Sequence, residues 1–531
     1  MTAGATAERS ALDELLERVG GLPPAAREEV RQTALQATAA LPWVPNAGPQ
    51  TEAFFCEADE LFYGGQAGGG KSDLLIGLSL TAHLDSLILR RVSKDAKSLA
   101  KRARKIAPRK SSFNGQDLLL TTPDGRSVEF GGLQLEDDKE RHKGRPHDLY
   151  GFDEICDYTE TQYTFVIGWN RSAEEGQRCR VVATGNPPTR PEGFWVLKRW
   201  GAWLDKNHPK PAKEGELRWY TTDDLGNEIE VDGRGPHKLE NCAKPVLARS
   251  RTFIRSRVTD NPDLVRSGYQ AQLDALPAHL RSAYRDGDFA AEINDDDWQV
   301  IPTAWIEAAQ QRWENKIPRG LAMTAMAVDV APGGGDKRVI AWRYGGWYAP
   351  LQAERVVDKT GRLTAAEVVK HRRDRCPVVV DMGGGWGGDA LIAMKDNGIT
   401  VVSFNGVVKS TARTRDGKKN FVNKRAEAAW RFREALDPSQ EGGSAVALPP
   451  DPELKADLAS YRYSDEVSGI LLEDKELQKK RIGRSPDKGD AVIMCLSEGQ
   501  RAVERAHRAG QTARPTTANT GGRTFASIRS R

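Results

Sequence analysis

The first half of the chain alternates short apolar runs with longer stretches of helical spacing. Four of the apolar runs have the length of buried strands; they are Leu61–Tyr63, Leu87–Val92, Leu149–Phe152 and Arg180–Pro188. Between them, residues 74–78 have helical spacing, and residues 94–107 predict a helix with many basic residues. This alternation predicts an α/β fold with a mostly parallel sheet.

Turn residues add two hairpins to this half of the chain. One lies in residues 118–133 around Pro123-Asp124-Gly125, and the other in residues 218–231 around Asp223–Asn227. Residues 1–41 predict two weakly amphipathic helices, which Gly-Gly-Leu-Pro-Pro at 20–24 separates.

From Leu321 onward the pattern changes to closely spaced strands. A hairpin turns at Gly345-Gly346, and helices are predicted for residues 421–436 and 485–496. The further predicted strands of this half are Met323–Val330, Pro377–Asp381, Val401–Phe404 and Ile470–Leu472. The chain therefore contains at least two domains, as its length of 531 residues also indicates.

The loop after the first predicted strand carries the complete phosphate-binding pattern GxxxxGK[ST]. Gly65, Gly70, Lys71 and Ser72 fill the pattern, and Gly68 and Gly69 lie within it. Glycines let backbone N–H groups surround phosphate oxygens, and the helix that follows points its N-terminus at the anion. We therefore predict an ATP site in which Lys71 reaches the β- and γ-phosphates and Ser72 holds Mg²⁺.

Asp153 and Glu154 follow the strand Leu149–Phe152, 82 residues after Lys71. We predict that Asp153 binds Mg²⁺ through its water shell. Glu154 would polarise the attacking water, because hydrolysis needs a proton acceptor in line with the γ-phosphate. A Glu directly after the Asp favours a water-activating ATPase over a phosphoryl transferase.

Two further positions are candidates for the same site. The strand that begins at Arg180 ends in Thr184, Gly185 and Asn186, where additional-strand ATPases sense the γ-phosphate; a simple turn is the alternative. Gln50 lies 15 residues before Gly65, where many nucleotide-driven motors place a glutamine against the adenine ring; a surface glutamine is equally compatible with the sequence.

Acidic residues end two strands of the second half and begin its last helix. Asp329 and Asp381 lie at strand ends, while Asp487 and Asp490 lie at the start of the helix. Two Mg²⁺ or Mn²⁺ ions need several shared carboxylate oxygens, so acids that converge in this way predict a two-metal phosphodiesterase. Strand-end and helix-capping aspartates are the structural alternative.

Composition limits the function classes further. Six scattered cysteines without a CxxC pair argue against a disulfide framework and a zinc site, and favour a reducing cytosol. Apolar runs are too short to span a membrane, and no secretory signal is present.

Net charge is only +4, but residues 90–110 hold ten Lys/Arg against one Asp, and residues 501–531 hold seven Arg against one Glu. Such clusters indicate local contact with a polyanion.

The order of these parts resembles the large terminase subunit of tailed bacteriophages over roughly residues 42–497. The segments that carry the resemblance are YGGQAGGGKS, YGFDE, ATGNPP, FIRSRVTDNPDL, AVDVAPGGGD, VVVDMGGGWG, NKRAEAAW, LEDKE and GRSPDKGDA. Members of this family hydrolyse ATP to move double-stranded DNA into a preformed capsid, and they cut the concatemer. The resemblance implies a P-loop ATPase of the additional-strand type, followed by a ribonuclease H-like nuclease domain.

The resemblance also implies roles for single residues. Lys71, Ser72, Asp153 and Glu154 would run the ATPase, and Thr184 to Asn186 would couple hydrolysis to movement. Asp329, Asp381 and a third acid would hold the nuclease metals. Asp487 matches the third position better, with Asp490 one helical turn away as a helper.

Cofactors and partners follow from the same resemblance. They are ATP, Mg²⁺ at the ATPase site, two Mg²⁺ or Mn²⁺ at the nuclease site, double-stranded viral DNA, a portal ring, a small terminase subunit and a homo-oligomeric ring. The expected location is the host cytoplasm, without a membrane. The alternative function is a helicase-like or recombination ATPase whose second half only binds DNA.

One departure from the family pattern concerns the phosphate loop. Many relatives carry an arginine inside it, whereas this loop has Gln66 and Ala67. We hypothesise that Arg141 or Arg145 acts as an arginine finger on a neighbouring subunit.

The predicted domain boundaries follow from these assignments. They are a helical extension at 1–41, the ATPase domain at 42–250, a lid or linker at 251–319, the nuclease domain at 320–500 and a basic tail at 501–531.

Overall fold

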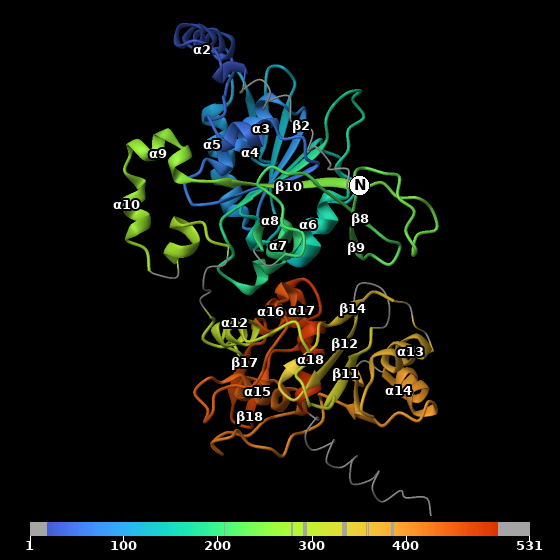
Figure 1. The fold of residues 1–531 in the computed structure, drawn as a ribbon. Coiled ribbons are helices and arrows are strands. Elements are labelled where there is room, and N and C mark those ends of the chain that lie inside the picture. The colour runs from blue at the N-terminus through green and yellow to red at the C-terminus, as the bar shows by residue number, and fades with distance from the viewer. Residues whose placement is uncertain are drawn as a thin grey trace, which may run out of the picture.

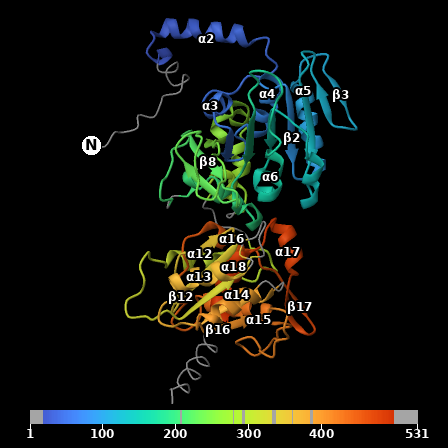
Figure 2. The same ribbon diagram turned by 90° about the vertical axis from the view of Figure 1, so that its right-hand side faces the viewer.

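A computed structural model describes residues 18–205, 208–277, 280–289, 295–331, 337–356, 358, 360–383 and 387–497. These residues form two lobes that lie one above the other in both ribbon views (Figures 1 and 2). Each lobe is built around its own sheet. The predicted α/β class with two successive sheet domains is confirmed.

The first lobe contains a ten-stranded sheet in the order β3-β4-β5-β2-β6-β7-β1-β10-β8-β9. Its strands are β1 (Glu60–Gly65), β2 (Asp85–Arg90), β3 (Ser112–Asn114), β4 (Leu119–Thr121), β5 (Ser127–Gly132), β6 (Leu149–Phe152), β7 (Arg180–Gly185), β8 (Arg218–Thr222), β9 (Glu228–Val231) and β10 (Arg249–Ser256). The six strands from β5 to β10 in this order are parallel, and the two predicted hairpins extend the sheet at its edges. Because β7 lies between β1 and β6, the sheet has the additional-strand arrangement.

Both faces of this sheet are covered, which explains the nearly continuous apolar runs of its strands. On β1, Leu61 and Tyr63 face one core and Phe62 faces the other, as alternate residues of a strand must. The first face carries α3 (Pro49–Phe55), α4 (Lys71–Thr81) and α5 (Ser93–Ile106); the second carries α6 (Glu160–Ile167), α7 (Phe194–Arg199) and α8 (Gly201–Leu204). The connections between strands and helices include three short 3-10 turns, which are η1 (Glu136–His142), η2 (Ile155–Asp157) and η3 (Pro191–Gly193).

The sheet continues beyond residue 250, where the sequence predicts the domain to end. Strand β10 pairs in parallel with β1, Glu60 opposite Arg251. The chain then forms η4 (Val258–Asp260), α9 (Pro262–Arg266), α10 (Tyr269–Asp274) and the π-helical turn η5 (Arg281–Arg285), within the segment predicted to be a lid or linker. Figure 1 shows α9 and α10 beside the first lobe.

The second lobe has a six-stranded sheet in the order β13-β12-β11-β15-β16, with β14 also paired to β12. Its strands are β11 (Ala325–Asp329), β12 (Arg338–Tyr344), β13 (Trp347–Tyr348), β14 (Gln352–Glu354), β15 (Val378–Asp381) and β16 (Val401–Phe404); β17 (Tyr463–Glu466) and β18 (Gly469–Leu472) form a separate hairpin. Strands β11, β15 and β16 are parallel, and β12 is antiparallel to β11. This mixed order is the arrangement expected for a ribonuclease H-like domain.

Helices cover both faces of this second sheet. One core contains α12 (Thr303–Gln311), α15 (Lys424–Leu436), α16 (Pro452–Ala459) and α18 (Asp487–Ser497), and the other contains α13 (Arg362–His371) and α14 (Gly387–Asp396). Helix α17 (Lys475–Ile482) follows β18. Because α18 packs on β11 and β12, its first turn lies near the carboxyl ends of the central strands.

The two lobes meet at α7, a few residues after the end of β7. Phe194 of α7 is buried in the core of the second lobe. Lys198 donates a hydrogen bond to Glu453 of α16 at 3.0 Å, and Arg481 of α17 pairs with Glu192 at 2.9 Å. The contact therefore combines an apolar anchor with partly exposed ion pairs.

The ends of the chain contribute little to either core. Helix α2 (Pro24–Thr38) confirms one of the two predicted N-terminal helices and lies apart from the sheet (Figure 2). The other predicted helix and the basic tail fall largely or wholly outside the described residues. Among the helices that are described, none has the length and apolar character needed to cross a bilayer.

Candidate active sites

The predicted phosphate loop connects the end of β1 with the start of α4. Lys71 is buried, and its ammonium donates hydrogen bonds to the carbonyl of Gln66 and, at 2.9 Å, to Oδ1 of Asn186. Burial lowers the pKa of Lys71, while Glu154 and Asp153 oppose that shift. Gly70 has a φ of +73°, and a Cβ there would lie 2.6 Å from Nε2 of Gln50. A glycine is therefore required where the loop enters the helix.

Asp153 is the hydrogen-bonding centre of this site. Its carboxylate accepts from Ser72 Oγ at 3.0 and 3.1 Å and from Thr184 Oγ1 at 2.7 Å. A third donor is Nε of Arg90, at 2.7 Å. Asp153 is only 1 % exposed, so these donors compensate a charge that water cannot reach. Ser72 and Asp153, both predicted to bind Mg²⁺, thus lie within hydrogen-bonding distance of each other.

Glu154 lies beside this centre in a left-handed backbone conformation, with a φ of +56°. Its carboxylate accepts from Nδ2 of Asn186 at 3.2 Å. Burial raises the pKa of Glu154 and the neighbouring Asp153 adds to the rise, whereas Lys71 and Arg90 lower it. A carboxylate whose proton affinity is increased in this way suits a group that accepts a proton from water.

Asn186 joins the two halves of the site, because its side chain contacts both Lys71 and Glu154. Strand β7 positions it by lying directly between β1 and β6. The structure therefore brings together the phosphate loop, the Asp-Glu pair and the predicted sensing residues at the carboxyl ends of three adjacent parallel strands.

Gln50 occupies a supporting position. Its Nε2 donates to the carbonyl of Gly70 at 2.9 Å, and its Oε1 accepts from the backbone N–H of Asn46 at 2.6 Å. Both ends of the amide are thus engaged within the protein, and the side chain fixes the end of the phosphate loop. The predicted contact with adenine stays a prediction.

Arg90 is a residue of this site that sequence reasoning did not identify. It ends β2, the strand next to β6, and its guanidinium also lies 4.0 Å from Glu154. The available signal was the position of Arg90 at the carboxyl end of a strand, where parallel strands place their functional residues. Without the strand order, nothing in the sequence linked it to Asp153.

The segment after β10 covers the phosphate loop. Asn261 donates to the carbonyl of Gly68 at 2.9 Å, and the backbone of Ala67 donates to Tyr284 at 2.8 Å. Val258 donates its N–H to the side chain of Gln66 at 2.9 Å. The loop is therefore held from two sides, by β1 and α4 within the sheet and by this covering segment.

Arg141 and Arg145, the predicted arginine fingers, lie away from this chain's own phosphate loop. Arg141 is largely exposed and pairs with Asp138 at 3.1 Å, and Arg145 pairs with Glu129 at 2.5 Å. A role at a neighbouring subunit stays a prediction.

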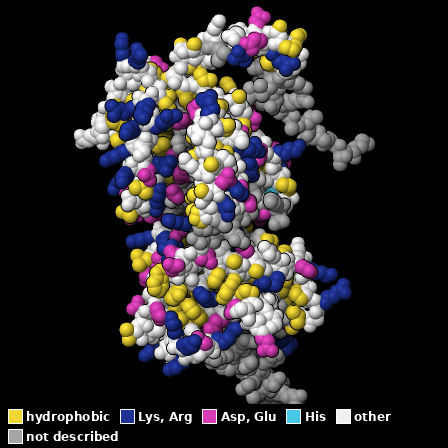
Figure 3. Space-filling view, turned by 90° about the vertical axis from the view of Figure 1, so that its left-hand side faces the viewer, with side chains coloured by type: hydrophobic (Ala, Val, Ile, Leu, Met, Phe, Trp, Pro, Cys, Tyr) yellow, Lys and Arg dark blue, Asp and Glu magenta, His cyan; other side chains and the backbone are white. Residues whose placement is uncertain are grey.

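The predicted basic helix is α5, which buries Ala96, Leu99, Ala100 and Ala103. It exposes Lys94, Lys97, Lys101, Arg104 and Lys105. Lys and Arg side chains also gather on the first lobe in the face that Figure 3 shows.

The second candidate site lies at the carboxyl ends of β11 and β15. Asp329 ends β11, Asp381 ends the neighbouring parallel strand β15, and Asp487 and Asp490 lie in the first turn of α18. Burial raises the pKa of Asp329 well above its usual range, and the other three acids raise it further, while Lys475 lowers it. The predicted acids therefore share one electrostatic environment.

Asp490 and Asp487 have different surroundings. Asp490 forms an ion pair with Lys475 at 2.8 Å and accepts from the Tyr461 hydroxyl at 2.6 Å. Asp487 accepts the backbone N–H of Lys337 at 3.0 Å. Asp490 lines the same cavity as Asp381, so the geometry favours Asp490 as the third acid, whereas the sequence favours Asp487.

The donor set fits a hard divalent cation in chemistry. Carboxylate oxygens are the preferred ligands of Mg²⁺ and Mn²⁺, and Oδ2 of Asp329 is buried without a hydrogen-bond partner. However, no three Asp, Glu, His or Cys groups in the described parts of the chain lie close enough together to hold one ion. Asp490 is instead neutralised by Lys475.

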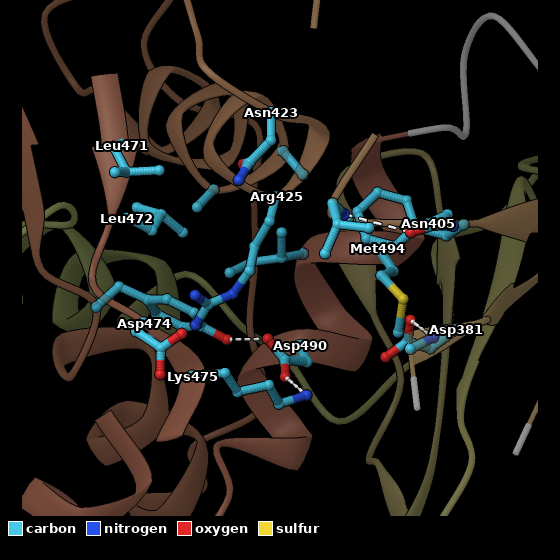
Figure 4. Close-up of a pocket in the computed structure, with 18 residues that line it drawn as sticks. Asp381, Asn405, Asn423, Arg425, Leu471, Leu472, Asp474, Lys475, Asp490 and Met494 are labelled. Carbon is cyan, nitrogen blue, oxygen red and sulfur yellow. Dashed lines mark hydrogen bonds and ion pairs between the residues drawn. The ribbon is translucent and has the colours of Figure 1, made fainter. Parts of the chain in front are cut away.

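A cavity of about 340 Å³ opens beside these acids (Figure 4). Asp381, Asp490 and Lys475 lie at one end of it. Side chains from α15, β18 and α18 form its walls.

Comparison with known proteins gives matches at the level of structure. No protein-family model and no curated protein matches the sequence. The chain is similar to solved structures of large terminases. The nuclease domain of the large terminase subunit of bacterial virus Sf6 is 20 % identical, with 37 % of this chain and 97 % of that chain covered and a TM-score of 0.31.

Two longer structures cover most of the chain. The large terminase of bacteriophage HK97 is 11 % identical, with 84 % of this chain and 92 % of that chain covered and a TM-score of 0.32. The large terminase of a thermophilic bacteriophage, in complex with ATP-γ-S, is 12 % identical, with 86 % of this chain and 100 % of that chain covered and a TM-score of 0.30.

Proposed function

We propose that this chain is the ATPase and nuclease subunit of a viral DNA-packaging motor. The observation that carries the ATPase part is the continuous set of contacts from Lys71 through Asn186 to Glu154. A protein that only binds nucleotide needs the phosphate loop, but it does not need a partly buried carboxylate of raised pKa beside it.

Each residue of this set has a defined part in hydrolysis. Lys71 and the loop N–H groups would hold the phosphates, and Ser72 and Asp153 would hold Mg²⁺. The metal supplies charge neutralisation between the phosphates when it is bound. Glu154 orients the attacking water and accepts its proton. Asn186 lies against both Lys71 and Glu154, so a change at the γ-phosphate is transmitted to the end of β7.

The nuclease part rests on the acids of the second lobe. Asp329, Asp381 and Asp490 would hold the metal ions, which activate water and stabilise the leaving oxygen during phosphodiester cleavage. Lys475 and Arg425 line the same cavity and would attract the DNA backbone. Because both proposed activities would lie in one chain whose lobes are in contact at α7, the proposal extends to packaging, with double-stranded DNA, a portal ring, a small subunit and a homo-oligomeric ring in the host cytoplasm.

The separation of the acids is the observation that favours the alternative function. If they never gather around a metal, the second lobe only binds DNA and the chain is a helicase-like or recombination ATPase.

The deciding experiment measures ATP hydrolysis and Mn²⁺-dependent plasmid cleavage by the full chain. The matched variants are Lys71→Ala and Asp381→Ala. We expect Lys71→Ala to abolish ATP turnover while cleavage persists, and Asp381→Ala to abolish cleavage while ATP turnover persists. A wild-type protein that hydrolyses ATP without ever cutting DNA would establish the alternative.

A further inference from the structure

The cavity beside the second site has a composition that cutting a phosphodiester does not require. Its walls are mostly apolar and come from Phe404, Val407, Ala428, Leu471, Leu472 and Met494. Metal ions, water and a phosphate group are all polar, and they need a polar, hydrated surface. A volume of about 340 Å³ lies within the range of small-molecule sites. We call this cavity the apolar chamber.

The apolar chamber is continuous with the acid cluster. Asp381, Asp490 and Lys475 belong to both, and Figure 4 shows the Lys475–Asp490 pair and Asp381 along one border of the chamber. A group that enters the chamber is therefore adjacent to any phosphate that lies at the acids. In DNA, each phosphate is joined through its sugar to a base.

Arg425 supplies a polar group inside the chamber. It extends from α15 towards Asp474 and Asp490 (Figure 4), and it donates to the carbonyl of Glu473 at 2.7 Å and to Gln478 at 2.6 Å. Its Nε is buried and donates to no acceptor among the described residues. The two hydrogen bonds fix Arg425 in the wall of the chamber, and the accessible polar side chains that line the chamber beside it include Asn405 and Asn423.

We propose that the apolar chamber receives one unpaired nucleobase of the DNA strand that is cut. This inference rests on the proposed nuclease function and adds a base-specific subsite to it. Apolar and aromatic side chains contact the faces of an extruded base, while a polar group contacts its edge. Phe404 and Leu472 would supply the faces, and the amide side chain of Asn423, which also lines the chamber, would contact the edge. The enzyme would thus prefer certain bases next to the cut.

The variants are chosen to close the chamber without touching the acids. Ala428→Phe fills it from α15, because Ala428 is only 2 % exposed and lines the wall. Val407→Trp narrows its rim from outside the core, because Val407 is 82 % exposed. Lys409→Trp is the matched control, since Lys409 is exposed in the same loop but does not line the chamber.

The first measurement uses DNA duplexes that carry 2-aminopurine at successive positions, mixed with the full chain without divalent metal. We expect a rise in fluorescence at one position, because the base leaves the stack, and we expect Val407→Trp and Ala428→Phe to abolish the rise. Lys409→Trp should retain it. No rise at any position, or a rise that both chamber variants retain, would overturn the proposal.

The second measurement compares Mn²⁺-dependent cleavage of normal duplexes with duplexes that are abasic at the same position. The chamber variants should slow cutting of the normal duplex by about tenfold and leave the abasic duplex within about twofold of wild type. Equal slowing of both duplexes would contradict base entry. If the wild type cuts nothing but the fluorescence rise is lost in the variants, the chamber binds a base and the nuclease function fails. If it cuts both duplexes equally in every variant, the nuclease function stands and the chamber proposal fails.

Discussion

Nε of Arg90 lies 2.7 Å from Oδ2 of Asp153, and the two residues come from neighbouring parallel strands. The contact brings a guanidinium next to a buried carboxylate that is predicted to bind Mg²⁺. The same guanidinium lowers the pKa of Glu154. Since the phosphate loop has no arginine of its own, Arg90 is, among the described residues, the cation that contacts the Asp-Glu pair directly.

We expect Arg90→Ala to lower kcat for ATP hydrolysis by about 10- to 100-fold, with a smaller effect on KM. Asp153 would lose a charged partner, and the loop lysine would have to serve both carboxylates. Arg90→Lys should recover part of the loss, because it restores the charge without the planar guanidinium. Steady-state ATPase assays measure both values.

Arg91→Ala is the control for this prediction. Arg91 is the next residue of the chain, but its guanidinium contacts Gln162 and not the Asp-Glu pair. If Arg90→Ala and Arg91→Ala reduce kcat equally, the effect comes from general loss of basic charge and Arg90 has no specific role.

Much of the fold follows from local sequence pattern. Residues 401–404 form β16 as predicted, and the hairpin predicted at Gly345-Gly346 joins β12 to β13. These elements are predictable because a strand or turn is specified by a few neighbouring residues. The glycines and Lys71 of the phosphate loop are predictable for the same reason, since their spacing alone determines the backbone of the loop.

Strand β10 shows why the remainder could not be predicted. Its sequence, RSRTFIRS, places Arg251 at a position that is buried in the sheet, where a charged residue is not expected. Arg251 is neutralised there by Glu228 at 2.6 Å and by Glu60 at 3.7 Å, and these contacts are set by strand pairing. The contacts of Arg90 with Asp153 and of Lys475 with Asp490 also depend on tertiary structure. Sequence spacing therefore predicted the individual residues but not how they pair.

Asn186 provides the second test of the ATPase site. We expect Asn186→Ala to bind ATP within about threefold of wild type but to hydrolyse it about tenfold more slowly, because Lys71 keeps its contact with Gln66 while Glu154 loses its side-chain donor. Binding is measured with a fluorescent ATP analogue, and turnover by phosphate release. A large loss of affinity with unchanged kcat would show that Asn186 serves binding alone.

The third prediction separates the two acids of α18. We expect Asp490→Asn to reduce Mn²⁺-dependent cleavage by more than about 100-fold. The substitution removes the negative charge that pairs with Lys475 and lines the apolar chamber. Asp487→Asn should reduce cleavage less, because Asp487 does not line the chamber and instead accepts a hydrogen bond from the backbone N–H of Lys337. Plasmid cleavage over a Mn²⁺ titration measures both. The reverse order of effects would assign the third ligand position to Asp487, as the sequence favours.

The fourth prediction concerns the contact between the lobes. Glu453 is 7 % exposed and is surrounded by Lys198, Lys337 and Lys488 at 2.7 to 3.1 Å. Glu453→Gln would leave these cations without their shared partner, and we expect it to destabilise the protein by about 3–5 kcal/mol. Urea denaturation measures the loss. Glu441→Gln, in an exposed turn, is the control and should have no effect.

The last prediction concerns Glu60, which begins β1 and pairs with Arg199 at 2.8 Å. Burial alone would raise the pKa of Glu60, but Arg199, Arg251 and Arg249 outweigh it and hold the pKa at about 2, against 4.5 for a free side chain. The folded state therefore gains about 3 kcal/mol at neutral pH, and it loses this gain as the pH falls from about 4.5 towards 2. We expect Glu60→Gln to be less stable than wild type in urea at pH 7, and the difference to narrow between pH 5 and pH 3. Glu57→Gln, at an exposed neighbour, should behave like wild type at every pH. A difference between Glu60→Gln and wild type that does not change with pH would mean that the pKa of Glu60 is not shifted by its arginines.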